Sequence, residues 1–371
     1  MKRKTYIDVA KGIAILLVIL GHMNRFFDYD GRLNQMVYSV QLPVFLVIGG
    51  YWMRLKQEES PVQFLEKKFY RLLQPYFFYA VFSILYAWPE NAEKFCFYVA
   101  GMLWGIGIRD YLPNLPIWFL PMFFVANLWF YLVLQIGRLG KKNWQKLLLE
   151  GLAVCILMAA GWKLKLKEER LPWGFELAMI LQGFFFAGHL WRLAEEYLGK
   201  LHPAEPAAAS KPADPGRNPE KKPEKKQCIL LTALLIPAFL IWAVCVKMNG
   251  RVDINAAWFG NKGLWSFYLA ALSGCYLVIF ASALLSRCRP IAWILSLFGT
   301  NSMAIMAVHV PVLIWMDGVI TPLMPAVIKA NYMTKNLIGV TYSFVTIALL
   351  SLFAALLLKR YPREGRKQAG N

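Results

Sequence analysis

Three ionisable residues lie in the first apolar stretch of the chain, and their types and spacing could do chemistry. They are Asp8, Lys11 and His22. The stretch has the character of a membrane helix, in which Lys11 and His22 would lie roughly 16 Å apart and only about 20° apart around the axis. Asp8, one turn before Lys11, is placed to pair with it. Because ionisable side chains in a membrane helix are expensive, this stripe predicts a functional site.

The composition predicts a polytopic, all-α membrane protein to carry that site. Of the 371 residues, 58% are hydrophobic, and they include 14 Trp, 17 Tyr and 25 Phe. A membrane span needs ~20 apolar residues, and its backbone must satisfy its own hydrogen bonds, so helices are expected. The alternation typical of an outer-membrane barrel is absent from the sequence. We predict about ten transmembrane helices, at residues 7–25, 35–53, 71–88, 116–136, 147–162, 175–192, 228–246, 265–286, 290–316 and 337–358.

The net charge of +19 predicts how these helices are oriented. Lys and Arg gather in alternate loops, which the positive-inside rule assigns to the cytoplasm, so we expect no nucleic-acid partner. Both termini and residues 193–227 are then cytoplasmic, with 89–115 and 318–336 outside. The short, Gly-rich stretch 95–108 is a re-entrant or interfacial segment, because a crossing there would put most basic loops outside. Four basic residues still fall on the outer side: Lys163, Lys165, Lys167 and Arg170.

The sequence predicts one membrane domain over residues 1–358, with a single interruption. Residues 202–227 are rich in Pro, Ala and Lys and have no apolar periodicity, which predicts a disordered cytoplasmic linker. Residues 359–371 form a short basic tail. The cysteines show no metal-ligand spacing, so we expect small buried thiols and no bound metal.

The first helix resembles the signature of the membrane-bound acyltransferase 3 superfamily. That signature is an Arg, ten residues and then a His; here Lys11 takes the Arg position and His22 follows at the same spacing. The pattern Asp8-x-x-Lys11-Gly12 with His22 is similar to the form common in the fucose 4-O-acetylase-like branch of sugar O-acetyltransferases. Lys is a point charge and lacks the bidentate grip of a guanidinium. We expect Gly12 to allow close helix packing.

Four further stretches resemble the family in the same order along the chain, so the resemblance covers nearly the whole membrane region. Each stretch alone is weak, because aromatic, Gly and Pro runs are common in membrane proteins; the ordered set is specific. They are Leu42–Tyr51 (similar to "P-hydrophobic-SGY", with Gly49 for Ser), Arg71–Tyr76 ("R-L-L-x-P"), Leu115–Leu120 ("WFL") and Phe298–Pro311 ("G-x-x-S…H-x-P").

The resemblance implies an integral O-acyltransferase of the bacterial inner (plasma) membrane, most simply an O-acetyltransferase. It would move acetyl from cytoplasmic acetyl-CoA to a sugar hydroxyl of a surface glycan or its lipid-linked precursor. Lys11 and Arg71 would hold the phosphates of CoA. His22 would be the general base on the hydroxyl, or would take the acyl group transiently. Asp8, Trp118 and His309 would support the site. Membrane lipid is a further partner, and self-association is compatible with the sequence.

Each candidate also has a purely structural interpretation. His22 could be a packed histidine at a helix end, Lys11 a snorkelling residue and Arg71 a topology anchor. His309 could make only a structural hydrogen bond, and Trp118 could belong to the core. We expect His189 to be structural. The acidic partner of His22 is left open among three residues: Asp28, Glu176 and Asp317.

The rival class is a transporter or flippase of a glycan precursor or small molecule, in which Lys11 and His22 form a polar relay. Ten spans fit that class too, but the sequence shows no pair of Gly/Pro-broken helices in matching halves. A sensory membrane module is a third class. Consumption of labelled acetyl-CoA discriminates the enzyme from the other two.

Overall fold

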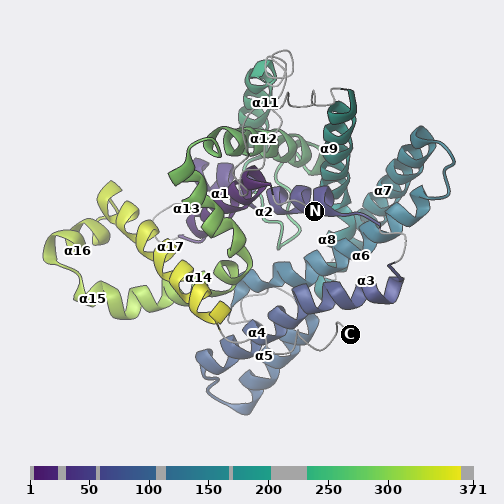
Figure 1. The fold of residues 1–371 in the computed structure, drawn as a ribbon. Coiled ribbons are helices and arrows are strands. Elements are labelled where there is room, and N and C mark those ends of the chain that lie inside the picture. The colour runs from purple at the N-terminus through teal and green to yellow at the C-terminus, as the bar shows by residue number, and fades with distance from the viewer. Residues whose placement is uncertain are drawn as a thin grey trace, which may run out of the picture.

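The chain is helical throughout the part that the computed structural model describes (Figure 1). The described residues are 4–23, 31–55, 59–105, 114–166, 170–201 and 232–360. Within them the one extended feature is an isolated bridge between Asp253 and Trp258. The prediction of an all-α fold is confirmed; the predicted linker 202–227 and the tail beyond residue 360 lie outside the described residues.

The first group of helical elements lies before the linker. They are α1 (Thr5–Gly21), α2 (Arg32–Trp52), α3 (Pro61–Lys68), the π-turn η1 (Phe69–Leu73), α4 (Gln74–Ala87), α5 (Ala92–Trp104), η2 (Leu115–Trp118), α6 (Phe119–Gly137), α7 (Asn143–Lys165), η3 (Pro172–Gly174), α8 (Phe175–Ile180) and α9 (Gln182–Leu201).

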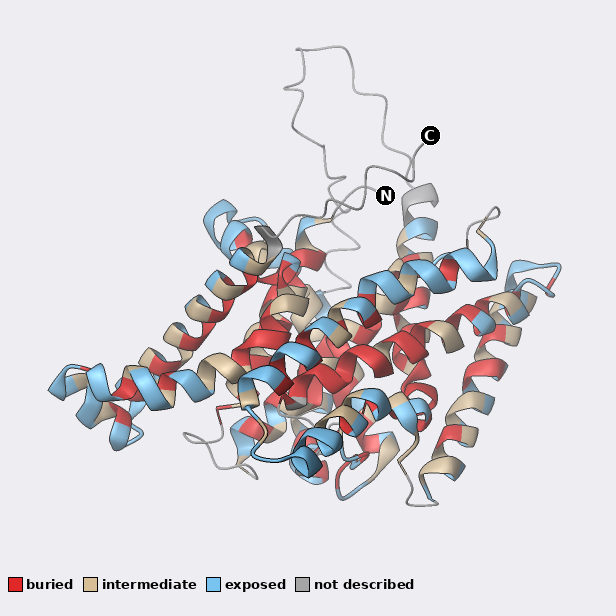
Figure 2. Cartoon of the chain, turned by 90° about the horizontal axis from the view of Figure 1, so that it is seen from below, coloured by how far each residue is buried: buried red, intermediate tan, exposed pale blue. Residues whose placement is uncertain are grey.

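The helices after the linker complete the assembly. They are α11 (Leu235–Asn249), α12 (Leu264–Leu285), α13 (Arg289–Thr300), α14 (Ser302–Trp315), the π-turn η4 (Met316–Ile320), α15 (Thr321–Leu323), α16 (Ala326–Met333) and α17 (Leu337–Arg360). Buried residues concentrate in the middle of the molecule, and the outer helices carry the exposed positions (Figure 2).

Six helices among the described residues are long and apolar enough to cross a membrane. A seventh span results if α8 and α9, which meet at 55°, act as one broken span. The predicted count of about ten is not confirmed, because three predicted spans correspond to shorter helices: α1 has 17 residues, α4 has 14 and α11 has 15. Helix α5, which overlaps the predicted re-entrant stretch, has 13 residues and rises only ~20 Å, too little to cross alone.

The predicted span 290–316 is wrong as a single helix. It breaks at Asn301 into α13 and α14, and the continuous apolar segment is instead Ser302–Leu323. The physical reason is that apolar periodicity does not separate two apolar helices joined by one residue. The break frees α13 to pack along α1.

Two glycines bring α13 and α1 into backbone contact. A Cβ atom on Gly12 would lie 2.0 Å from the carbonyl oxygen of Leu295, and one on Gly299 would lie 1.8 Å from the carbonyl oxygen of Asp8. No side chain fits at either position, so the two helices approach as closely as their backbones allow. The expectation that Gly12 serves close packing is confirmed.

The ends of the helices gather in two groups, one of which lies at the start of α1. At the start of α1, Lys4 Nζ lies 2.6 Å from Glu195 Oε2 and 2.5 Å from the Tyr51 hydroxyl, so the ends of α2 and α9 lie there. Burial would lower the pKa of Lys4, but its bonds to Glu195 and Tyr51 outweigh burial and raise the pKa. In the predicted topology the start of α1 and the ends of α2 and α9 all lie on the cytoplasmic side, so their contacts agree with that topology. Which side of the membrane is cytoplasmic stays a prediction.

The second group of loops gathers around the segment before α8. Arg170 Nη1 donates to the carbonyl of Asn255, and the indole of Trp173 donates to the carbonyl of Leu103 at 2.8 Å. Two of the four basic residues predicted to lie outside have local partners in this region. Arg170 Nε lies 2.8 Å from the buried carboxylate of Glu176, and Lys165 Nζ lies 4.6 Å from the ring of Trp162. These local partners give both cations a structural role, so their position does not have to follow the positive-inside rule.

Candidate active site

Lys11 and Asp8 form an ion pair on α1, as the sequence predicts. Lys11 Nζ lies 2.7 Å from Asp8 Oδ1, and the side chain of Asp8 is 8% exposed against 26% for Lys11. The pair sits where Gly12 and Gly299 hold α13 against α1. The cation is therefore fixed by a buried carboxylate on a rigid helix, with part of its surface still open.

His22 ends α1, and a hydrogen bond sets its tautomer. Its Nδ1 lies 2.8 Å from the carbonyl oxygen of Val18, one turn earlier. A carbonyl only accepts, so Nδ1 carries the hydrogen and Nε2 keeps its lone pair in the neutral ring. The ring is partly exposed. His22 thus presents a basic nitrogen, about three turns from Lys11 along the same helix.

His309 on α14 meets His22, although the two are far apart in sequence. The ring centroids are 4.9 Å apart, with an interplanar angle of 71°. His309 Nδ1 donates to the carbonyl oxygen of Ile305 at 3.1 Å, so its Nε2 also keeps a lone pair. The residue is 0% exposed, and Nε2 has no hydrogen-bond partner among the described residues. The structure thus brings these two predicted site residues together.

A proline in α14 explains how the segment of Trp118 is attached to the site. Pro311 has no N–H, so the carbonyl of Ala307 loses its helical partner. The side chain of Asn114 supplies the missing donor at 2.5 Å and thereby ties η2 to α14, two residues before His309. Trp118 is buried in η2. No motif in the sequence singles out Asn114, although the internal proline indicates that a donor must come from another element.

None of the acids proposed as partners of His22 is seen in that role. Glu176 is buried and bound to Arg170, because the segment before α8 folds back on it. Asp317 accepts a hydrogen bond from the hydroxyl of Tyr332. Asp28 lies outside the described residues. Among the described residues, Asp253, in the loop between α11 and α12, is a carboxylate whose charge acts on His22, and no sequence signal singled it out.

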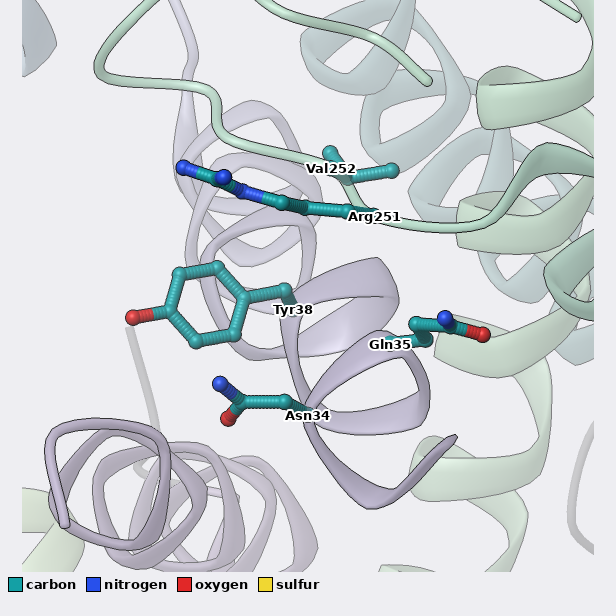
Figure 3. A pocket seen from close by; sticks show the side chains of 5 residues that line it. All are labelled: Asn34, Gln35, Tyr38, Arg251 and Val252. Atoms are coloured by element: carbon teal, nitrogen blue, oxygen red, sulfur yellow. The ribbon is translucent and has the colours of Figure 1, made fainter. Parts of the chain in front are cut away.

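A shallow, open hollow lies next to the end of α1. Figure 3 shows its lining, with three side chains of α2 opposite two residues of the loop that contains Asp253. The hydroxyl of Tyr38 donates to the carbonyl of Gly21 at 3.2 Å, so the hollow adjoins His22. Its walls offer amide, phenol and guanidinium groups. The lining residues are Asn34, Gln35, Tyr38, Arg251 and Val252.

Arg71 does not lie at a helix end, where the sequence analysis placed it. The helical stretch begins ten residues earlier, at Pro61, because Ser60 and Gln63 form a capping box there. Arg71 lies exposed within η1, a π-turn of the kind that often marks functional positions. Lys68, one turn before it, binds Asn127 Oδ1 at 2.6 Å, midway along α6. Lys68 therefore lies against α6, and no sequence pattern had singled it out.

His189, expected to be structural, belongs to a buried polar chain between α7 and α9. Its Nδ1 accepts from Arg192 Nη2 at 2.9 Å, and its Nε2 lies 3.2 Å from Glu150 Oε2. The Nδ1 atom is thus hydrogen bonded, and Nε2 lies within ion-pair distance of a buried carboxylate. The histidine clamps two helices.

These features define a class: a helical membrane protein that presents basic nitrogens at one end of its first helix and a fixed cation in the second turn of that helix. A family model described as an acyltransferase domain, acyltransferase 3, matches residues 4–360. The chain belongs to the acyltransferase 3 family and is a membrane acyltransferase. No curated protein and no solved structure matches it.

Proposed function

We propose that the protein is an O-acetyltransferase of the sugar-modifying branch of its family. It takes acetyl from cytoplasmic acetyl-CoA and places it on a hydroxyl of an extracytoplasmic or lipid-linked glycan in the bacterial inner membrane. The observation that carries the proposal is the pair of imidazoles at the end of α1, each with its Nδ1 hydrogen bonded and its Nε2 lone pair available.

The reaction follows from the atoms that His22 presents. Nε2 accepts the proton of the acceptor hydroxyl while the hydroxyl oxygen attacks the thioester carbonyl carbon. The carbon–sulfur bond then breaks, and CoA leaves as a thiolate that takes up the proton. Asp253, within electrostatic range, favours the positive charge that His22 carries between these two proton transfers.

The donor is held by cations away from the reacting atoms. Lys11, fixed by Asp8, and Arg71, exposed on η1, bind CoA phosphates, and Lys68 adds positive charge beside Arg71. The long pantetheine arm then spans the distance from the phosphates to His22. Donor binding at Lys11 and reaction at His22 agree with the predicted sidedness, in which Lys11 faces the cytoplasm and His22 faces the acceptor. Positioning of two substrates on one rigid helix supplies much of the catalysis.

The test uses purified protein in detergent with acetyl-CoA labelled in the acetyl group. We expect label to move to an added polyol and to leave CoA with a free thiol, and we expect His22→Ala to stop both. Label trapped on the protein, and lost in His22→Ala, would instead indicate the acyl-carrier route. Movement of a glycan precursor across vesicles without acetyl-CoA consumption would establish the rival transporter function. Mass spectrometry of surface glycans with and without the gene then identifies the natural acceptor.

A further inference from the structure

Two buried hydrogen-bond acceptors near the end of α1 have no donor among the described residues. Nε2 of His309 is fully buried and has no partner among the described residues. The side-chain oxygen of Gln41, in a residue only 2% exposed, is also without a partner there. That oxygen lies 2.8 Å from where a Cβ of Gly21 would stand, directly before His22. Buried polar atoms normally find partners, so this cluster indicates a ligand that supplies donors.

The tautomers show what kind of ligand fits. Both histidines spend their Nδ1 hydrogens on carbonyls of their own helices, so both offer only lone pairs to a neutral ligand. A phosphate or carboxylate would bring further acceptors and would leave the cluster unsatisfied. A compound with several hydroxyl groups brings one donor for each acceptor. The 4.9 Å spacing of the ring centroids lets hydroxyls on adjacent carbons reach both rings.

We propose that the acceptor substrate binds as a vicinal diol. One hydroxyl gives its proton to Nε2 of His22 and is acetylated, while the neighbouring hydroxyl donates to Nε2 of His309, which selects for it. The amide of Gln41 accepts from the next polar group of the same ring. The inference rests on the proposed acetyl transfer and adds the pattern of hydroxyls that the enzyme requires, with His309 as the residue that reads it.

The first experiment compares two probes, cis-cyclohexane-1,2-diol and cyclohexanol, as acceptors for the purified full-length protein with acetyl-CoA. We expect a higher kcat/KM for the diol. In His309→Phe, which keeps a ring but has no acceptor, we expect the ratio of diol to cyclohexanol to fall roughly ten- to hundredfold. His309→Gln places an amide oxygen near the position of Nε2 and should restore part of the ratio. His202→Phe, in the predicted linker, is the control and should keep it.

Two outcomes would overturn the proposal while leaving acetyl transfer intact. One is a wild-type protein that uses both probes equally well. The other is a His309→Phe variant that slows both probes by the same factor, because His309 would then act through His22 and not on the acceptor. Absence of acetyl transfer from the wild type to any acceptor would instead contradict the proposed function.

A second measurement does not depend on turnover. The chain has only four histidines, so protein labelled with ¹⁵N at histidine gives a spectrum that single variants can assign. We expect unprotonated Nε2 signals for His22 and His309, and a shift of the His309 signal when the diol is added without acetyl-CoA. An unchanged His309 signal at saturating diol, or an equal shift with cyclohexanol, would contradict diol recognition.

Discussion

The imidazoles of His22 and His309 meet edge to face with their ring centroids 4.9 Å apart, and each gives its Nδ1 hydrogen to a carbonyl of its own helix. Nearly three hundred residues separate them in the sequence, and the two helices that bear them come from opposite sides of the linker. The site is therefore assembled by the whole membrane domain. Substitutions in elements that hold α1 or α14 in place should therefore change the activity even though those elements do not contact a substrate.

Lys11→Ala should raise the KM for acetyl-CoA roughly three- to tenfold, because it removes a partly exposed charge that binds phosphate. Lys11→Arg should retain much of the affinity. Removal of Lys11 also leaves the buried carboxylate of Asp8 unpaired, which costs stability. The double variant Asp8→Asn/Lys11→Gln removes both charges and separates the effects. An unchanged KM in a folded double variant would show that Lys11 does not hold the donor.

Gly12→Ala and Gly299→Ala should each destabilise the protein by about 1–3 kcal/mol and lower its activity, because a Cβ at either place would overlap a carbonyl of the other helix. Thermal unfolding in detergent measures the effect. Gly318→Ala is the matched control, since no atom lies within 4 Å of a Cβ there. Equal melting temperatures for all three variants would refute the close approach of α1 and α13.

Asn114→Leu should destabilise α14 by about 1–3 kcal/mol, because the carbonyl of Ala307 then loses its replacement donor inside the protein. Pro311→Ala restores a backbone N–H that can bond the same carbonyl. The double variant should therefore recover stability that the single variant loses, which a double-mutant cycle measures as a coupling. Simple additivity of the two changes would mean that Asn114 and Pro311 act independently.

The sequence predicted the features that depend on local pattern. The pairing of Asp8 with Lys11 follows from helical spacing, and the packing role of Gly12 follows from its lack of a side chain. The break at Asn301 was not predicted, because the apolar character of the sequence continues across it. Asp253 was not predicted either, because only the tertiary fold brings its loop to His22, and nothing in its own stretch distinguishes it.

The position of Arg71 also could not be predicted from hydropathy alone. The run Arg71–Tyr76 was predicted to enter a helix, but the capping box at Ser60 begins the helical stretch ten residues before Arg71. Pro75 then distorts the helix into the π-turn that carries Arg71. Capping and π-turns depend on individual side chains, which an average over a hydropathy window removes.

Sidedness can be tested by cysteine labelling of intact cells in a variant that lacks the native cysteines. We expect an impermeant reagent to label a cysteine at Thr334, which is exposed in the predicted outer segment, and not one at Ser210 in the linker. Thr321 is less suitable, because it is buried. The reverse labelling pattern would invert the topology and with it the direction of transfer.

The role of His22 as the base of an acetyl transfer is tested most directly by the product formed from acetyl-CoA labelled in its acetyl group. We predict that wild-type protein yields an acetyl ester on a polyol, detected by mass spectrometry, and that folded His22→Ala forms it roughly 10²–10⁴-fold more slowly. His202→Ala, a histidine in the predicted linker, should match the wild type. Ester formation by His22→Ala at the wild-type rate would contradict the account.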